Sequence, residues 1–149
     1  MVALVVVSHS RALARAALGL AEQMLTTRRP PIELAAGLDE QTYGTDATAI
    51  AAAITVADAA SEGDGVVVLT DLGSAVLSAD LALELLDDGL RERVVLSPGP
   101  LVEGLVMAAV TAATGADLTR VAAVAADALM PKQAALGRRT PSAGQDDLS

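Results

Sequence analysis

The chain has 149 residues, 52% of them hydrophobic, and Tyr43 is its only aromatic residue. This length predicts a single domain whose core is built from Ala, Val, Leu and Ile. A net charge of −9 at pH 7 and the near absence of aromatic rings disfavour nucleic acid as a ligand, and the absence of cysteine excludes disulfides, thiolate catalysis and most structural zinc sites.

The first predicted element is a strand over Val2–Val7, a continuous and mostly β-branched run typical of a strand buried on both faces. A helix is predicted over Arg11–Leu25, where apolar residues recur at helical spacing until polar and proline residues at 26–31 end it. The apolar run at the amino terminus is too short for a signal peptide or a membrane span, so we expect a soluble, cytoplasmic protein with no membrane partner.

Strand and helix signals alternate along the rest of the chain. Further strands are predicted at Ile32–Ala36, Val66–Leu69 and Val94–Leu96, and further helices from Thr45 or Asp46 to about Ala60, over Ala75–Leu86, over Leu101–Thr114 and over Leu118–Leu129. This alternation predicts an α/β fold, a small doubly wound and mainly parallel sheet of about four strands with flanking helices. We expect residues 1–130 to form the domain and residues 131–149 to be a disordered tail.

His9, the only histidine, is the first candidate for chemistry. It follows the first strand, and side chains at the carboxyl end of such a strand face the crevice where open α/β sheets bind ligands. A neutral imidazole is also a good nucleophile near pH 7. We therefore predict a phosphorylatable or otherwise catalytic histidine, with helix capping or pocket lining as the alternative.

Asp71 is the predicted companion of His9, because the first and third strands are expected to be neighbours. A carboxylate that accepts a hydrogen bond from one imidazole nitrogen fixes the tautomer and leaves the other nitrogen free to attack. Capping of the following helix is the alternative role for Asp71, and the two roles are compatible. Ser10, Gly73 and Ser74 lie at predicted helix amino termini, where they are expected to hold phosphoryl oxygens.

Gly44 and Thr45 precede a helix, so capping is their simplest interpretation, although their loop is also able to reach over the site. Other kinds of site lack their motifs: the chain has no P-loop, no dinucleotide fingerprint, no acidic pair of a receiver domain and no nucleophile elbow. A metal site would need carboxylates alone. We therefore expect no metal and no cofactor, which leaves a histidine nucleophile.

Several segments, in order along residues 1–128, resemble one family. They are Leu4–Ser10, Gly44–Asp46, Asp71–Ala75 with Ala79–Leu86, and Pro100–Gly104 followed by Thr114–Ala116. Together they resemble the phosphotransferase subunit (DhaM type) of phosphoenolpyruvate-dependent dihydroxyacetone kinase. The domain of that family is similar to the IIA domain of the mannose-type sugar phosphotransferase system, a doubly wound parallel sheet that commonly forms dimers.

The resemblance implies a phosphoryl relay. The phosphocarrier HPr, charged through enzyme I, would phosphorylate His9, and His9 would pass the group to ADP on the nucleotide-binding subunit of the kinase. Some family members carry HPr-like and enzyme I-like domains after this one; this sequence has neither, so the donor is expected to be a separate protein. The resemblance also implies a homodimer. Two alternatives stay open: a mannose-type IIA component that serves a IIB domain, and a non-catalytic regulatory module controlled by phosphorylation of His9.

Overall fold

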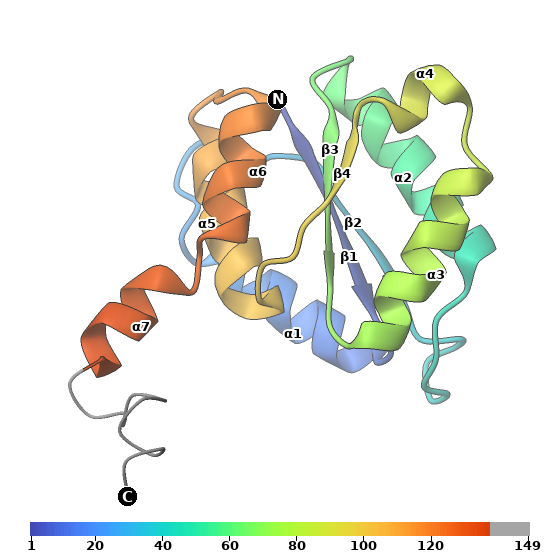
Figure 1. Cartoon of the computed structure of the whole chain (residues 1–149), viewed down its shortest axis with the longest axis horizontal. Coiled ribbons are helices and arrows are strands. Elements are labelled where there is room, and N and C mark those ends of the chain that lie inside the picture. The colour runs from blue at the N-terminus through green and yellow to red at the C-terminus, as the bar shows by residue number, and fades with distance from the viewer. Residues whose placement is uncertain (138–149) are drawn as a thin grey trace, which may run out of the picture.

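A single parallel sheet forms the centre of the computed structural model, which describes residues 1–137. Its strands are β1 (Ala3–Ser8), β2 (Ile32–Ala36), β3 (Val66–Thr70) and β4 (Val94–Leu96), in the order β2-β1-β3-β4 (Figure 1). Every neighbouring pair is parallel. The predicted doubly wound parallel sheet is confirmed, and β1 and β3 are its central strands.

Helices cover both faces of this sheet. They are α1 (Arg11–Glu22), α2 (Ala47–Ser61), α3 (Gly73–Glu84), α4 (Asp88–Arg91), α5 (Leu101–Ala113), α6 (Leu118–Ala126) and α7 (Met130–Leu136). Successive residues of a strand point to opposite faces, so Leu4 and Val6 of β1 pack under α1, α5 and α6, while Val5 and Val7 pack under α2 and α3. Two apolar layers, one on each face of the sheet, therefore hold the domain together (Figure 1).

Small side chains let the helices approach the sheet closely. The buried face of α1 consists of Ala14, Ala17 and Ala21, whereas its larger residues Leu13 and Leu20 are exposed. Its amphipathic pattern was enough to predict the helix, which ends at Glu22, three residues before the predicted end. Helix boundaries are the least certain part of such predictions, because capping rather than periodicity decides them.

The predicted disordered tail is wrong for its first residues. Helix α7 runs over Met130–Leu136 and projects from the body of the domain (Figure 1). Pro131 lies in its first turn, where proline is tolerated, and most of the residues that follow are good helix formers. The Lys132 Nζ atom lies 2.7 Å from Glu103 Oε2, which ties α7 to α5. The rest of the predicted tail, residues 138–149, lies outside the described residues.

Within the part of the chain that the structure describes, no helix is both long enough and apolar enough to cross a membrane.

Candidate functional site

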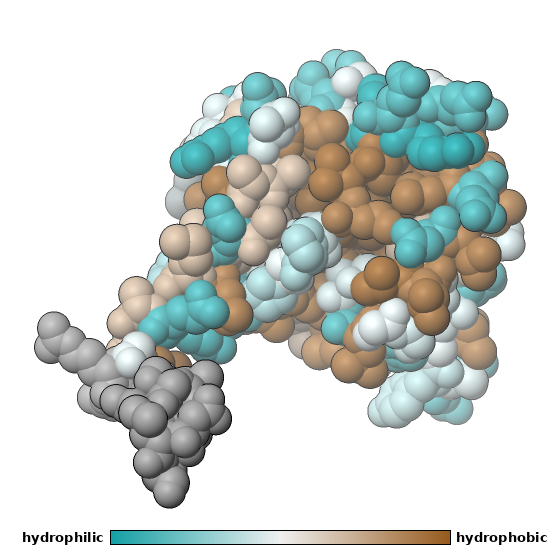
Figure 2. All heavy atoms as spheres, in the orientation of Figure 1, coloured by the Kyte–Doolittle hydropathy of each residue, from teal (hydrophilic) through white to brown (hydrophobic). Residues whose placement is uncertain are grey.

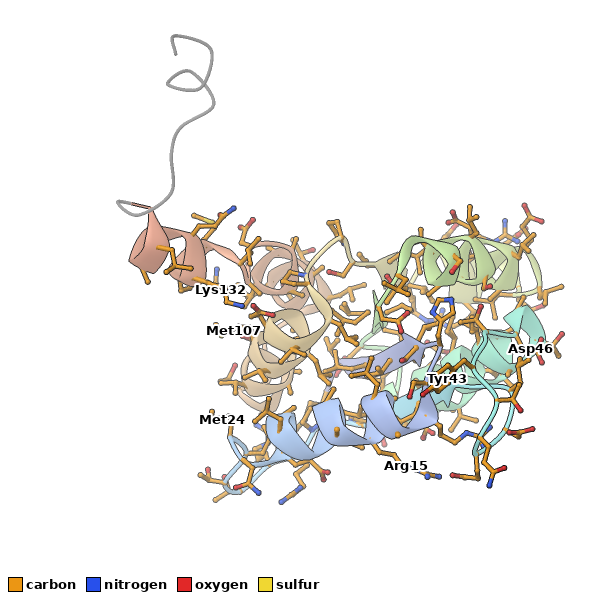
Figure 3. All side chains as sticks on the ribbon, turned by 90° about the horizontal axis from the view of Figure 1, so that it is seen from below. Arg15, Met24, Tyr43, Asp46, Met107 and Lys132 are labelled. Atoms are coloured by element: carbon orange, nitrogen blue, oxygen red, sulfur yellow. The ribbon has the colours of Figure 1, made fainter. Side chains whose placement is uncertain are left out.

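The predicted pair His9 and Asp71 meets at the carboxyl ends of the two central strands. The register of β1 and β3 places Val7 opposite Thr70, so the residues that follow these strands are neighbours. The Asp71 N–H donates to the Val7 carbonyl at 3.1 Å, and the His9 N–H donates to Asp71 Oδ2 at 2.9 Å. The imidazole Nδ1 lies 2.9 Å from Asp71 Oδ1. Figure 3 views the molecule from this edge of the sheet.

The hydrogen bonds around His9 assign its tautomer. An ionised carboxylate only accepts hydrogen bonds, so Nδ1 of the neutral imidazole carries the proton and its N–H donates a hydrogen bond to Asp71 Oδ1. The other nitrogen, Nε2, then holds a lone pair, and the Ser74 hydroxyl donates to it at an Oγ–Nε2 distance of 2.6 Å. The His9 side chain is 24% exposed. Nε2 is thus held next to the Ser74 hydroxyl, on a side chain that is partly accessible.

Asp71 is held ionised by its hydrogen bonds. Burial acts to raise the pKa of the Asp71 carboxyl, but the donors around it outweigh that effect, so the pKa lies below its usual value. These donors are the His9 backbone N–H, the His9 ring, the Leu72 N–H and the Ser8 hydroxyl. Asp71 is therefore a fixed negative charge beside the imidazole near neutral pH.

Ser8 is a residue of this network that the sequence did not single out. It ends β1, is fully buried, and donates its hydroxyl to Asp71 Oδ2 at 2.9 Å. The Ser8 Oγ atom also accepts a hydrogen bond from the Ser10 N–H at 3.1 Å. The available signal was a polar residue at the end of an apolar run, since a buried hydroxyl needs hydrogen-bond partners. Ser8 thus holds Oδ2 of the carboxylate, whereas the imidazole ring contacts Oδ1.

Two helices begin beside His9, and their amino ends differ. Ser10 is the N-cap of α1, and its hydroxyl accepts the Leu13 N–H at 3.1 Å. Helix α3 has Leu72 at its N-cap, with no side-chain capping bond. The first amides of a helix have no partner within it, so Gly73 and Ser74 present open donors at the helix end whose Ser74 hydroxyl contacts the ring. The predicted phosphoryl contact of Ser10 stays a prediction, and its hydroxyl is a cap here.

A loop after β2 closes the site on one side. Gly37 begins it at φ 67°, and a Cβ there would lie 2.9 Å from the Asp39 carbonyl oxygen, so a larger residue does not fit this turn. The Gly44 N–H donates to the His9 carbonyl at 2.9 Å. Thr45 Oγ1 lies 2.6 Å from Ser78 Oγ of α3, whereas Asp46 caps α2. Of the two predicted loop residues, Gly44 therefore contacts the His9 backbone directly, whereas Thr45 contacts α3, the helix whose Ser74 lies against the imidazole.

Two arginines of α1 fasten this loop. Arg15 binds the Glu40 carboxylate through both terminal nitrogens, at 2.7 and 2.8 Å, and Arg11 reaches it at 3.3 Å. Hydrogen bonds from Arg15, followed by those from Arg11, lower the pKa of Glu40 to about 2. The Arg11 Nε–H also donates to the Ala36 carbonyl at 2.9 Å. This cluster joins α1, β2 and the loop at the edge of the site.

Comparisons with known families and solved structures find matches that cover most of the chain. The family model for the PTS system fructose IIA component (EIIA-man) matches residues 3–122. A solved structure titled as a protein of unknown function, EF1359, superposes with a TM-score of 0.69 at 31% identity, covering 85% of this chain and 93% of that one.

Curated relatives are phosphoryl donor subunits (DhaM) of PEP-dependent dihydroxyacetone kinase. The protein of Pantoea ananatis is 46% identical over 144 residues, which is 95% of this chain and 30% of the relative. That of Escherichia coli is 46% identical over 139 residues, 92% of this chain and 29% of the relative. The chain thus spans about 30% of the length of these two proteins. The DhaM of a second such kinase in Listeria innocua is 35% identical, covering 74% of this chain and 85% of the relative.

Proposed function

The chain belongs to the EIIA-man family, and from this premise we propose that it is the phosphohistidine relay subunit of a phosphoenolpyruvate-dependent dihydroxyacetone kinase. In this proposal it is a cytoplasmic phosphotransferase component that accepts a phosphoryl group from HPr and passes it to ADP on the nucleotide-binding subunit. The observation that carries the proposal is the pairing of His9 with Asp71, which directs the lone pair of Nε2 toward Ser74 and the open end of α3.

The geometry supports Nε2 of His9 as the acceptor atom. As Nε2 attacks phosphorus, the bond between phosphorus and the nitrogen of the carrier breaks, and its electron pair stays on the carrier's imidazole. The His9 ring, still protonated on Nδ1, becomes cationic, and Asp71 stabilises that charge at 2.9 Å. In the second transfer, a terminal phosphate oxygen of ADP attacks the phosphorus. The bond between phosphorus and Nε2 breaks, and its electron pair returns to Nε2, so His9 is neutral again.

The start of α3 suits the phosphoryl oxygens. The Ser74 hydroxyl, which donates to Nε2 in this state, can rotate and donate to an oxygen of the new phosphoryl group. The amides of Gly73 and Ser74 and the positive end of the helix dipole lie at the same place. Because phosphoryl transfer depends mainly on positioning and on stabilising charge, this small set of donors is sufficient for a relay.

A homodimer is part of the proposal. The edge strand β4 is short and apolar, and apolar side chains gather on the face of the molecule where it lies (Figure 2). The unpaired backbone groups of an edge strand and an exposed apolar surface are both features that a second copy of the chain can cover. Sedimentation equilibrium is expected to give twice the mass of the chain, and a monomer at micromolar concentration would remove this part of the proposal.

The relay is tested by incubating the chain with phosphoenolpyruvate, enzyme I and HPr. We expect an acid-labile phosphate on the wild type and none on His9→Ala; labelling of His9→Ala overturns the proposal. The next step adds the ADP-loaded kinase subunits in one reaction and a IIB domain in another. Transfer to ADP is expected. Transfer to the IIB domain would identify a mannose-type IIA component, and transfer to neither would identify a regulatory module.

A further inference from the structure

The side chains of Asp71, His9 and Ser74 form a connected line whose order suits a second kind of chemistry. Asp71 Oδ1 lies 2.9 Å from Nδ1 of the imidazole, and Nε2 of the same ring lies 2.6 Å from Ser74 Oγ. A phosphohistidine relay needs the carboxylate and the imidazole, whereas the hydroxyl on the second ring nitrogen adds a third member. A carboxylate, an imidazole and a hydroxyl joined in this order are the arrangement by which hydrolases activate a serine.

The His9 ring has the tautomer that a general base toward Ser74 requires. Its Nδ1–H donates to Asp71, so the lone pair of Nε2 is the acceptor for the Ser74 hydroxyl, at a distance over which a base can take a proton. When that proton moves, the ring becomes cationic beside the Asp71 carboxylate. The Asp71 side chain is only 9% exposed and is held by the Ser8 hydroxyl and the His9 backbone N–H. A fixed carboxylate therefore stabilises the cation that this proton transfer forms.

Ser74 also lies where the oxyanion of an acyl transfer can be stabilised. It is the second residue of α3, and the N-cap residue Leu72 makes no side-chain capping bond. Attack of Oγ on an ester carbonyl places negative charge on the carbonyl oxygen, and the first amides of the helix and its dipole favour a negative charge at this end. The sequence has no nucleophile elbow, but such a triad is defined by geometry and by the roles of its members rather than by sequence position.

The surroundings of Ser74 indicate the class of ester that would react. Ser74 is exposed, so a substrate reaches it from the surface. Leu72 and Leu77 are 63% and 67% exposed, and Leu77 lies one turn beyond Ser74, on the same face of α3. The Asp71 carboxylate and the net charge of −9 disfavour an anionic substrate. A small, uncharged carboxylic ester with an apolar acyl or aryl group therefore fits this site best.

We propose that the unphosphorylated chain hydrolyses small uncharged carboxylic esters, with Ser74 as nucleophile, His9 as general base and Asp71 as the group that orients the ring. Ser74 Oγ forms a bond to the acyl carbon while its proton passes to Nε2. The bond between the acyl carbon and the oxygen of the alcohol then breaks, and the imidazolium gives its proton to that oxygen. Water, deprotonated by His9, releases the carboxylic acid and restores Ser74. This activity goes beyond the proposed relay and is absent while His9 carries a phosphoryl group, because Nε2 then has no lone pair.

Phenylmethylsulfonyl fluoride tests whether Ser74 is an activated nucleophile. A bond forms between Ser74 Oγ and sulfur, the bond between sulfur and fluorine breaks, and fluoride leaves while the hydroxyl proton passes to His9. Peptide mass spectrometry is expected to find the sulfonyl group on Ser74 and not on Ser78, the matched serine one turn later, which contacts Thr45. Labelling is expected to slow about 100-fold or more in His9→Ala, because a positioned general base contributes at least that factor. A sulfonyl group on His9, equal labelling of Ser78, or an unchanged rate in His9→Ala overturns the proposal.

Hydrolysis of 4-nitrophenyl acetate tests turnover. The rate is expected to fall about tenfold or more in Ser74→Ala, and the matched variant Ser78→Ala is expected to keep the wild-type rate. An unchanged rate in Ser74→Ala would assign the hydrolysis to the imidazole alone and overturns the proposal.

Phosphoramidate, a small donor that phosphorylates histidine without a carrier protein, provides a test in the folded wild type. Phosphorylation of His9 is expected to suppress both sulfonylation of Ser74 and ester hydrolysis, and either reaction persisting at the original rate overturns the proposal. None of these assays contains HPr or ADP, so their outcome and that of the relay assay are independent.

Discussion

Two helices begin within reach of His9, and their amino ends are built differently. At the start of α1 the Ser10 hydroxyl accepts the Leu13 N–H, and the Ser10 N–H is itself bound by Ser8. At the start of α3 the N-cap residue is Leu72, whose side chain accepts nothing. Both helices follow central strands of the same sheet, so the contrast comes from the capping residues rather than from their position in the fold.

This difference in capping gives the amino ends of α1 and α3 different expected roles, one in stability and the other in phosphoryl transfer. A capped helix end is satisfied and adds stability, whereas an uncapped end keeps donors and dipole free for an anion. The open end belongs to α3, whose Ser74 already contacts the reactive nitrogen. We therefore expect changes at α3 and at Asp71 to alter the relay, and changes at the start of α1 to alter mainly stability.

The largest effect is expected from Asp71→Asn. An amide does not hold the Nδ1 proton as a carboxylate does, so the tautomer with a lone pair on Nε2 is lost and the developing cation is not stabilised. Single-turnover transfer from phosphorylated HPr is expected to slow by about 100-fold or more, since loss of an orienting carboxylate costs a serine protease about 10⁴-fold in kcat. An unchanged rate with a lower melting temperature would show that Asp71 serves only the structure.

A smaller effect is expected from Ser74→Ala, which removes one donor to the phosphoryl group. The rate of transfer is expected to fall about tenfold, because hydrogen bonds to charged groups contribute roughly this factor. Ser78→Ala is the matched control, since this hydroxyl lies one turn further along α3 and contacts Thr45 rather than the imidazole. Equal rates in the two variants would remove Ser74 from the site.

The sequence was sufficient for the sheet and for the central pair. Buried, mostly β-branched runs such as Val66–Leu69 mark strands whatever their partners, and parallel neighbours bring their carboxyl ends together. That reasoning placed His9 next to Asp71, as the register of β1 and β3 confirms. Periodicity and topology were therefore enough for these features, because both depend on local patterns and simple geometry.

The rest of the site depends on contacts between distant side chains. Ser8 supports Asp71 from the end of a strand, and Glu40 reaches two arginines on α1. Neither contact produces a recognisable pattern in the local sequence, because each joins residues that only the tertiary fold brings together. Helix α3 also begins at Gly73, two residues before the predicted start, which is why Ser74 faces the ring directly.

A third prediction concerns substitutions that add a capping side chain to the open amino end of α3. Leu72→Asp and Leu72→Asn both place a capping oxygen before α3, and each is expected to raise the free energy of unfolding by about 1 kcal/mol. Labelling by phosphoramidate, which bypasses docking, is expected to slow about threefold in Leu72→Asp and less in Leu72→Asn, since only the acid repels the phosphoryl group. Stabilisation without any slower labelling would show that the free amides of α3 do not receive phosphoryl oxygens.

The smallest effect on phosphoryl transfer is expected from a change at the start of α1. The pH dependence of stability distinguishes a change there from a change at Asp71. Ser10→Ala is expected to lower the free energy of unfolding by about 1 kcal/mol, equally at pH 7 and pH 3, because a hydroxyl cap does not titrate. Asp71 differs, since its pKa is lowered in the folded state. The stability that the ionised Asp71 carboxylate contributes is present above the pKa of about 3.9 that it has in the unfolded chain. This stability is lost as pH falls through the lower pKa of the folded state. The gap between wild type and Asp71→Asn in denaturant unfolding is therefore expected to shrink below about pH 4, while the Ser10→Ala gap stays constant. Parallel pH profiles for the two variants, or slower phosphoryl transfer in Ser10→Ala, would mean that both helix ends belong to one site.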